Sequence, residues 1–194
     1  MAVRILVFPG SNRTGSFNGQ LADAVVKTLA EMGAEPTRIS LADYDMPIFD
    51  QDLENEKGIP ENVMKLGRMI AAHDGVVLVC PEYNASVTPL MKNTIDWVSR
   101  ISSDSGKPLK PWKDKPVALG SASNGRLGGI RGLYHVRAAL MNVGAHILTQ
   151  QVAVSGASKA FDEKGMLKQD MGKPLLDDVC QSLIDYCAAT TRNA

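Results

Sequence analysis

Continuous apolar runs alternate along this chain with segments whose apolar residues are three or four positions apart. Residues 5–8 form an uninterrupted apolar run that ends at Pro9 and Gly10, which is typical of a strand buried on both faces. Residues 17–32 then carry apolar side chains at helical spacing and stop at Gly33, which predicts an amphipathic helix. The same two patterns recur to the end of the chain.

The patterns together predict five strand–helix units. The expected strands are 3–8, 37–41, 75–80, 117–122 and 147–154, and the expected helices are 17–32, 59–72, 88–100, 130–143 and 174–190. Strands that alternate with helices imply an α/β fold, with a parallel sheet covered by helices on both faces. Five units favour a flavodoxin-like sheet of order 2-1-3-4-5 over a closed barrel, which needs eight. With no repeat or linker in the sequence, residues 1–194 are expected to form a single domain.

Composition excludes several classes of function. Hydrophobic residues make up 44% of the chain and aromatic residues only 5%, so the core is expected to be mostly aliphatic. The 21 basic and 21 acidic residues balance, which indicates neither a nucleic-acid-binding surface nor a polybasic membrane patch. The apolar run at residues 5–8 is too short for a signal peptide or a membrane span.

Cysteine and histidine spacing gives no sign of a disulfide framework or a metal site. The cysteines Cys80, Cys180 and Cys187 are odd in number, far apart and without C-x-x-C spacing. The three histidines are also widely separated. We therefore expect a cytoplasmic protein without a bound metal.

The segment 10–18, directly after the first strand, has the chemistry of a phosphate site. Backbone N–H groups at the start of the next helix favour an anion. Ser11, Thr14 and Ser16 add hydroxyl donors, and the guanidinium of Arg13 suits phosphate oxygens. The alternative is a plain polar turn in which Ser16 caps the helix.

Two familiar phosphate motifs do not fit this segment. Gly10 and Gly15 have the glycine spacing of a Walker A loop, but Ser16 stands where that loop needs lysine. Asn12 stands where the dinucleotide fingerprint needs its second glycine. The sequence therefore disfavours both a nucleotide triphosphatase and a Rossmann dehydrogenase.

Two further polar loops follow the third and fourth expected strands, at residues 81–86 and 121–129. Each alone can be read as an ordinary turn or a glycine-rich connection. Because parallel strands end at the same edge of a sheet, all three loops are expected to converge there. A flavin ring, its ribityl chain and its phosphate would span such an edge, with Tyr83 beside the ring.

Taken together, two of these motifs resemble the NADPH-dependent FMN reductase family. They are Gly10-Ser11-x-Arg13-x-x-Ser16-x-Asn18 after the first strand and Pro81-Glu82-Tyr83-Asn84 after the third. The resemblance implies that the motif at residues 10–18 holds the phosphate and ribityl end of FMN. It also implies that the motif at residues 81–84 borders the isoalloxazine ring and that Ser121 contacts the edge of this ring. The cofactor-binding residues expected on this basis are Ser11, Arg13, Ser16, Phe17, Asn18, Pro81, Glu82, Tyr83, Asn84 and Ser121.

The resemblance also implies an activity. NADH or NADPH would reduce FMN and leave, and a quinone, chromate or a ferric complex would then take the electrons. Since the flavin carries the hydride, no side chain is expected to be catalytic with certainty, although Glu82 and Tyr83 are candidates for positioning a substrate. The family is typically dimeric or tetrameric, with the helix at residues 88–100 near the interface.

Two other functions remain as alternatives. An electron-carrier flavodoxin is less favoured, because such proteins usually lack an arginine in the first loop and are strongly acidic. A flavin-binding regulator without enzymatic activity is the other alternative.

Three further segments have no part in the motifs above. Two of them have two possible roles, and for the third only its location is predicted. The basic stretch with Lys107, Lys110, Lys113 and Lys115 is either a solvated loop or a lip that attracts the phosphates of a nicotinamide nucleotide. Trp97 near Arg100 suits either the core or an interface. The acidic segment 43–57 is expected to wrap the surface after the second strand.

Overall fold

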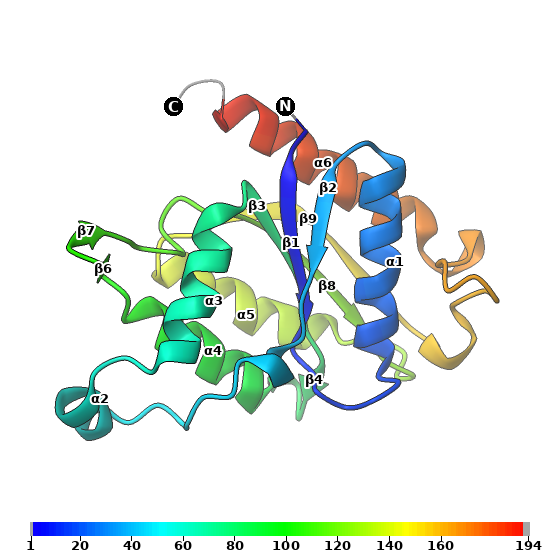
Figure 1. Cartoon of the computed structure of the whole chain (residues 1–194). Coiled ribbons are helices and arrows are strands. Elements are labelled where there is room, and N and C mark those ends of the chain that lie inside the picture. Colours follow the sequence, from blue (N-terminus) through cyan, green and yellow to red (C-terminus); the bar gives the residue numbers. More distant parts are fainter. Residues whose placement is uncertain (1, 192–194) are drawn as a thin grey trace.

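Five parallel strands form the central sheet of the computed structural model, which describes residues 2–191 (Figure 1). The strand order is β2-β1-β3-β8-β9, and every neighbouring pair is parallel. The bounds are β1 Arg4–Pro9, β2 Glu35–Arg38, β3 Gly75–Val79, β8 Pro116–Ala122 and β9 His146–Val154. The predicted flavodoxin-like order 2-1-3-4-5 is therefore confirmed.

Helices cover both faces of this sheet (Figure 1). One face carries α1 (Phe17–Glu31) and α6 (Lys173–Thr191), and the other carries α3 (Glu61–Ala72), α4 (Pro89–Ser99) and α5 (Ile130–Asn142). Alternate residues of β1 point into the two cores: Ile5 and Val7 pack towards α1, and Leu6 and Phe8 towards α3. A strand buried on both faces needs apolar residues at every position, which explains the uninterrupted run in the sequence.

Side-chain caps fix where two of the helices begin. The Oγ of Ser16 accepts from the N–H of Gly19 at the start of α1, and Thr88 accepts from Met91 at the start of α4. Pro60 is the N-cap residue of α3 rather than part of its first turn, so this helix begins two residues later than predicted.

The second strand was predicted too late in the chain. β2 occupies Glu35–Arg38, and the buried Leu41 belongs instead to a short 3-10 helix, η1 (Leu41–Asp43), which Ser40 caps. An edge strand tolerates a polar sequence and a proline because one of its sides makes no ladder. Apolar content therefore pointed to the wrong residues here.

Several short elements were not predicted. They are the helix α2 (Gln51–Lys57), the hairpin of β4 (Glu82–Tyr83) and β5 (Ser86–Val87), and the hairpin of β6 (Ser103–Asp104) and β7 (Lys107–Pro108). Two-residue strands show no period that a sequence pattern could reveal.

The segment after η1 wraps the surface, as expected, and it does so over α4, where it buries Trp97. The indole N–H of Trp97 donates to the carbonyl of Pro47 at 2.7 Å, and Phe49 meets the Trp97 ring edge-on at 5.0 Å between centroids. Arg100 pairs with Glu54 at 2.9 Å on the outside of this contact. Trp97 is fully buried and is thus a core residue, which agrees with the first of the two interpretations.

The outer strand β9 is irregular where it pairs with β8. Val117 lies opposite Ile147 but Leu119 lies opposite Gln151, so β9 bulges at residues 148–150. The guanidinium of Arg137, on α5, donates to the carbonyl of Leu148 at 2.7 Å and to the side-chain oxygen of Gln151 at 3.0 Å. The Arg137 side chain therefore supplies a hydrogen-bond donor to the Leu148 carbonyl, which lies in the part of β9 outside the regular β8–β9 ladder.

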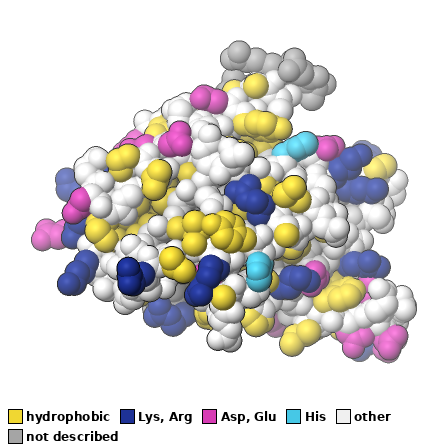
Figure 2. Space-filling view, turned by 180° about the vertical axis from the view of Figure 1, so that it is seen from behind, with side chains coloured by type: hydrophobic (Ala, Val, Ile, Leu, Met, Phe, Trp, Pro, Cys, Tyr) yellow, Lys and Arg dark blue, Asp and Glu magenta, His cyan; other side chains and the backbone are white. Residues whose placement is uncertain are grey.

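The surface carries both signs of charge. On the face shown in Figure 2, lysine and arginine side chains are interspersed with acidic ones around a band of hydrophobic residues. Within residues 2–191 no helix is long and apolar enough to cross a membrane.

All three cysteines are buried thiols. Burial raises the pKa of Cys180 and Cys187 to about 12, and it raises the pKa of Cys80 further still. Each thiol is therefore protonated at neutral pH, including Cys80 next to the loop at residues 81–86.

Candidate functional site

The loops that follow β1, β3 and β8 converge at the carboxyl edge of the sheet, as predicted. They enclose a hollow of about 190 Å³. Most of the predicted cofactor-binding residues line it, namely Ser11, Arg13, Ser16, Phe17, Asn18, Pro81, Glu82 and Tyr83, together with Ala122, Ser123 and Asn124. Asn84 and Ser121, also predicted, are not among the lining residues.

The loop after β1 offers unpaired donors to an anion. The backbone N–H groups of Thr14, Gly15, Phe17 and Asn18 have no acceptor within residues 2–191. Arg13 is exposed beside them and makes no ion pair in the same part of the chain. Unpaired amides at a helix N-terminus next to a guanidinium fit a phosphomonoester, the group that FMN would place here.

Ser16 matches both interpretations of this loop. Its Oγ accepts a hydrogen bond from Gly19 at 3.0 Å, so it is the helix cap that the alternative interpretation required. A hydroxyl also has one hydrogen to donate, and this hydrogen remains available for a phosphate oxygen.

Asn18 joins two of the loops. Its Nδ2 donates to the carbonyl of Ala122 at 2.9 Å, and its Oδ1 accepts from the N–H of Ala122 at 3.0 Å. The side chain is 5% exposed, so these bonds are shielded from water. Asn18 therefore fixes the start of α1 against the end of β8 and sets the distance between the first and third loops.

Glu82 is held by α5. Its carboxylate accepts from Nε of Arg131 at 2.9 Å and from the N–H of Gly132 at 3.2 Å. Burial alone would raise the pKa of Glu82, but the bonds from Arg131 and Gly132 and the charge of Arg131 outweigh it and lower this pKa. The carboxylate is thus ionised and occupied at neutral pH, and its role in positioning a substrate stays a prediction.

Tyr83 stands at the rim of the hollow with 55% of its surface exposed. The β4–β5 hairpin carries it, and Ser86 in β5 bonds Nδ1 of His135 through its Oγ at 2.7 Å. Sequence reasoning missed both α5 partners, Arg131 and His135, because they lie 49 positions further along the chain.

The hairpin turn is strained at Ala85. Asn84 and Ala85 have φ of 50° and 63°, as in a two-residue type I′ turn, whose second position usually holds glycine. A non-glycine residue in the left-handed region costs about 1 kcal/mol. The strain lies next to Tyr83, at the edge of the hollow.

Ala85→Gly is expected to raise the free energy of unfolding by up to about 1 kcal/mol, measured by urea titration, because glycine adopts this backbone without strain. Ala71→Gly, at an exposed position within α3, is the matched control and should lower the same quantity by about 1 kcal/mol. A loss of stability in Ala85→Gly would show that the turn is not strained.

Ser121 stabilises the loop after β8 through a buried hydrogen bond. It is fully buried, and its Oγ donates to the carbonyl of Gly128 at 2.8 Å. Gly128 has a φ of +60°, and a Cβ there would come within 2.8 Å of the backbone of Ala153. The loop thus requires glycine for its close approach to β9, and the Ser121 hydroxyl is engaged with the protein itself.

The basic stretch lies at the opposite edge of the sheet. The N–H of His146 donates to the carbonyl of Lys115 at 2.9 Å, and that of Asp114 to Gly144 at 2.8 Å, at the amino ends of β8 and β9. The ammonium of Lys115 bonds the carbonyl of His73. Within one chain this stretch therefore lies away from the three loops, and its role as a lip for a nicotinamide nucleotide stays a prediction.

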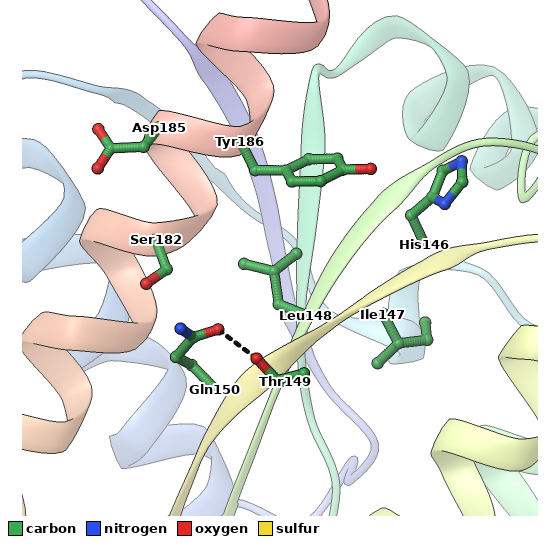
Figure 3. A pocket seen from close by; sticks show the side chains of 8 residues that line it. All are labelled: His146, Ile147, Leu148, Thr149, Gln150, Ser182, Asp185 and Tyr186. Atoms are coloured by element: carbon green, nitrogen blue, oxygen red, sulfur yellow. Dashed lines mark hydrogen bonds between the residues drawn. The ribbon is translucent and has the colours of Figure 1, made fainter.

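A larger hollow of about 520 Å³ lies between β9 and α6, away from the three loops (Figure 3). Its walls include His146 and Tyr186, whose ring centroids are 6.2 Å apart, and His146 lies 3.5 Å from Asp114. No group of three metal-ligating side chains occurs within residues 2–191. This hollow therefore offers no chemistry comparable to that of the three loops.

Comparison with known proteins agrees with this geometry. The family model described as NADPH-dependent FMN reductase matches residues 3–159. A quinone reductase of Escherichia coli K12 is 38% identical over 157 residues, covering 79% of this chain and 78% of that protein. An NAD(P)H-dependent FMN reductase of Pseudomonas aeruginosa is 33% identical and covers 93% of both chains.

Among solved structures, the flavoenzyme FerB of Paracoccus denitrificans, an NAD(P)H:(acceptor) oxidoreductase, has a similar fold. Its TM-score is 0.80 at 24% identity, with 97% of this chain and 98% of that chain covered.

Proposed function

The chain belongs to the NADPH-dependent FMN reductase family, and from this premise we propose that it binds FMN across the loops after β1, β3 and β8 and reduces quinones with electrons from NADPH or NADH. The observation that carries the proposal is that Phe17 and Asn18, whose backbone N–H groups have no acceptor within residues 2–191, line the same hollow as Arg13 and Tyr83.

The residues of the three loops would divide the binding. Arg13, the Ser16 hydroxyl and the amides of Phe17 and Asn18 would hold the phosphate, because these residues line the hollow and the donors have no competing acceptor within residues 2–191. Pro81 and Tyr83 would border the ring, and the unpaired N–H of Asn84 would face its polar edge. When bound, FMN supplies the hydride acceptor and the electron donor for the reaction.

The protein's own contribution is placement. Glu82 is ionised and held by Arg131, and the Cys80 thiol is buried and protonated, so neither is free to shuttle a proton. The exposed Tyr83 is the side chain best placed to meet an incoming substrate. Such a site holds the reactants in place and leaves the redox chemistry to the cofactor.

We also propose that the protein is a homodimer or homotetramer with α4 near the interface, as the family resemblance implies. Exposed Tyr134 and Met141, seven positions apart on the neighbouring helix α5, support an interaction surface on this side of the sheet. Sedimentation velocity tests this part of the proposal, and a monomer at micromolar concentration would contradict it.

The purified protein is expected to be yellow, and NADPH or NADH should bleach it under anaerobic conditions without any partner protein. Stopped-flow absorbance measures this reduction, and rapid reoxidation by 1,4-benzoquinone should follow. An electron carrier would instead stay oxidised until a partner reductase is added. A colourless protein that takes up no FMN on titration would contradict the whole proposal.

A further inference from the structure

A second hollow, of about 300 Å³, lies on the β2 side of the first loop. Its walls come from the loop, the outer face of α1 and the end of β2, with Arg38 and Ser40 at the far side from Tyr83. Ser11, Arg13 and Ser16 line this hollow and the FMN hollow alike, so the two adjoin across one loop.

Arg38 is held in place with donors to spare. Its Nε donates to Oδ1 of Asp23 at 3.0 Å, and its Nη1 bonds the carbonyl of Ile39. A guanidinium has five N–H donors, so these two bonds leave the remainder of the fork open. The side chain is 28% exposed, which means that it is partly shielded from water yet accessible at the hollow.

The second hollow suits a phosphate group. Arg38 contributes a positive charge that the FMN phosphate would not use, and Asp23 is the one acid among the residues that line this hollow. Thr14 and Ser40 each retain a hydroxyl hydrogen, because the Oγ of Ser40 only accepts, from Ala42, and Thr14 makes no side-chain bond within residues 2–191. Arginine forks and hydroxyl donors are the groups that bind a phosphomonoester.

We propose that this hollow binds the 2′-phosphate of NADPH, and that Arg38 thereby makes the enzyme prefer NADPH over NADH. The proposal rests on the proposed function, because NADPH must also deliver its nicotinamide to the flavin. NADPH carries its 2′-phosphate on the ribose of its adenosine half and its nicotinamide on the other half, so the two groups can occupy separate but adjoining hollows. NADH differs only in lacking that phosphate, so Arg38 discriminates between the two nucleotides.

The test compares kcat/KM for NADPH and NADH in the FMN-loaded enzyme with saturating 1,4-benzoquinone. Arg38→Gln is expected to lower the value for NADPH roughly 10- to 100-fold and that for NADH less than about threefold, because hydrogen bonds to a charged group are lost only with NADPH. Arg38→Lys should fall between, since it keeps the charge and loses the fork. Arg4→Gln, at the far end of β1, is the matched control and should change neither value.

Asp23→Asn provides a change in the opposite direction. It keeps an oxygen for Nε of Arg38 and removes the negative charge, so kcat/KM for NADPH should rise while that for NADH stays the same. An unchanged NADPH-to-NADH ratio in both variants, or a wild-type preference for NADH, would overturn the proposal. Misfolding would lower kcat/KM for NADH as well, so the ratio counts against the proposal only where kcat/KM for NADH stays at its wild-type value.

Binding of 2′,5′-ADP to the wild-type protein, measured by calorimetry against 5′-AMP, separates this inference from the proposed function. Tight binding of 2′,5′-ADP that Arg38→Gln abolishes would support the second hollow even if neither nucleotide reduced the flavin. Equal binding of 2′,5′-ADP and 5′-AMP would overturn the second hollow, whether or not the reductase activity is present.

Discussion

Arg13→Ala is expected to weaken FMN binding roughly 10- to 100-fold, because it removes the charged hydrogen bonds to the phosphate, worth about 1.5–3 kcal/mol. The guanidinium stands beside four unpaired amides, and no carboxylate within residues 2–191 competes for it. Quenching of flavin fluorescence on titration of the apoprotein gives the dissociation constant. Arg13→Lys should lose less affinity, since it keeps the charge and loses only the fork.

Riboflavin is the sharpest control for this prediction, because it has the ring and the ribityl chain but no phosphate. Arg13→Ala should bind riboflavin as the wild-type protein does. Lys65→Ala, which removes an exposed positive charge from α3, should leave FMN binding unchanged. If Arg13→Ala lost affinity for riboflavin and FMN equally, the arginine would act on the shape of the loop and not on the phosphate.

Asn18→Ala should lower the free energy of unfolding by about 2–4 kcal/mol, because it leaves the buried N–H and carbonyl of Ala122 without partners. Both bonds are shielded, and they join parts of the chain 104 positions apart. Urea denaturation followed by circular dichroism measures the loss. The variant should also bind FMN more weakly, because the first and third loops lose their fixed distance.

Asn18→Asp separates the two bonds. The carboxylate can still accept from the N–H of Ala122 but faces its carbonyl without a donor, so this variant should also be destabilised. Asn12→Ala, on the exposed part of the same loop, should change stability by less than about 0.5 kcal/mol. A loss in Asn18→Ala no larger than in Asn12→Ala would show that the buried bonds do not hold the loops together.

The hydrophobic pattern of the sequence predicted the strands correctly where both faces of the strand are buried. β1 and β3 are covered on both faces, so nearly every position is apolar, and their predicted bounds agree with the structure to within one residue. β2 was misplaced because an edge strand with exposed Glu35 and with Pro36 has no such requirement. The two-residue hairpins were missed because partners elsewhere in the fold, such as α5 under β4 and β5, decide whether they form.

In the candidate site, the sequence likewise predicted the position of the loops but not the role of each side chain. Topology alone brought the three loops together, since parallel strands end at one edge. What each polar side chain does there depends on distant partners: Asn18 bonds Ala122, Glu82 bonds Arg131, and the Ser121 hydroxyl bonds Gly128. Residue type and spacing indicate a polar site, but they cannot separate a side chain that serves the ligand from one that holds the loop.

The bulge in β9 has a consequence for how the protein behaves at high concentration. A regular outer strand presents a row of backbone donors and acceptors on which a foreign strand can build, which leads to aggregation. At residues 148–150 that row is broken, and Arg137 occupies the carbonyl of Leu148. The protein should therefore resist edge-to-edge stacking into fibrils while its sheet stays open on that side.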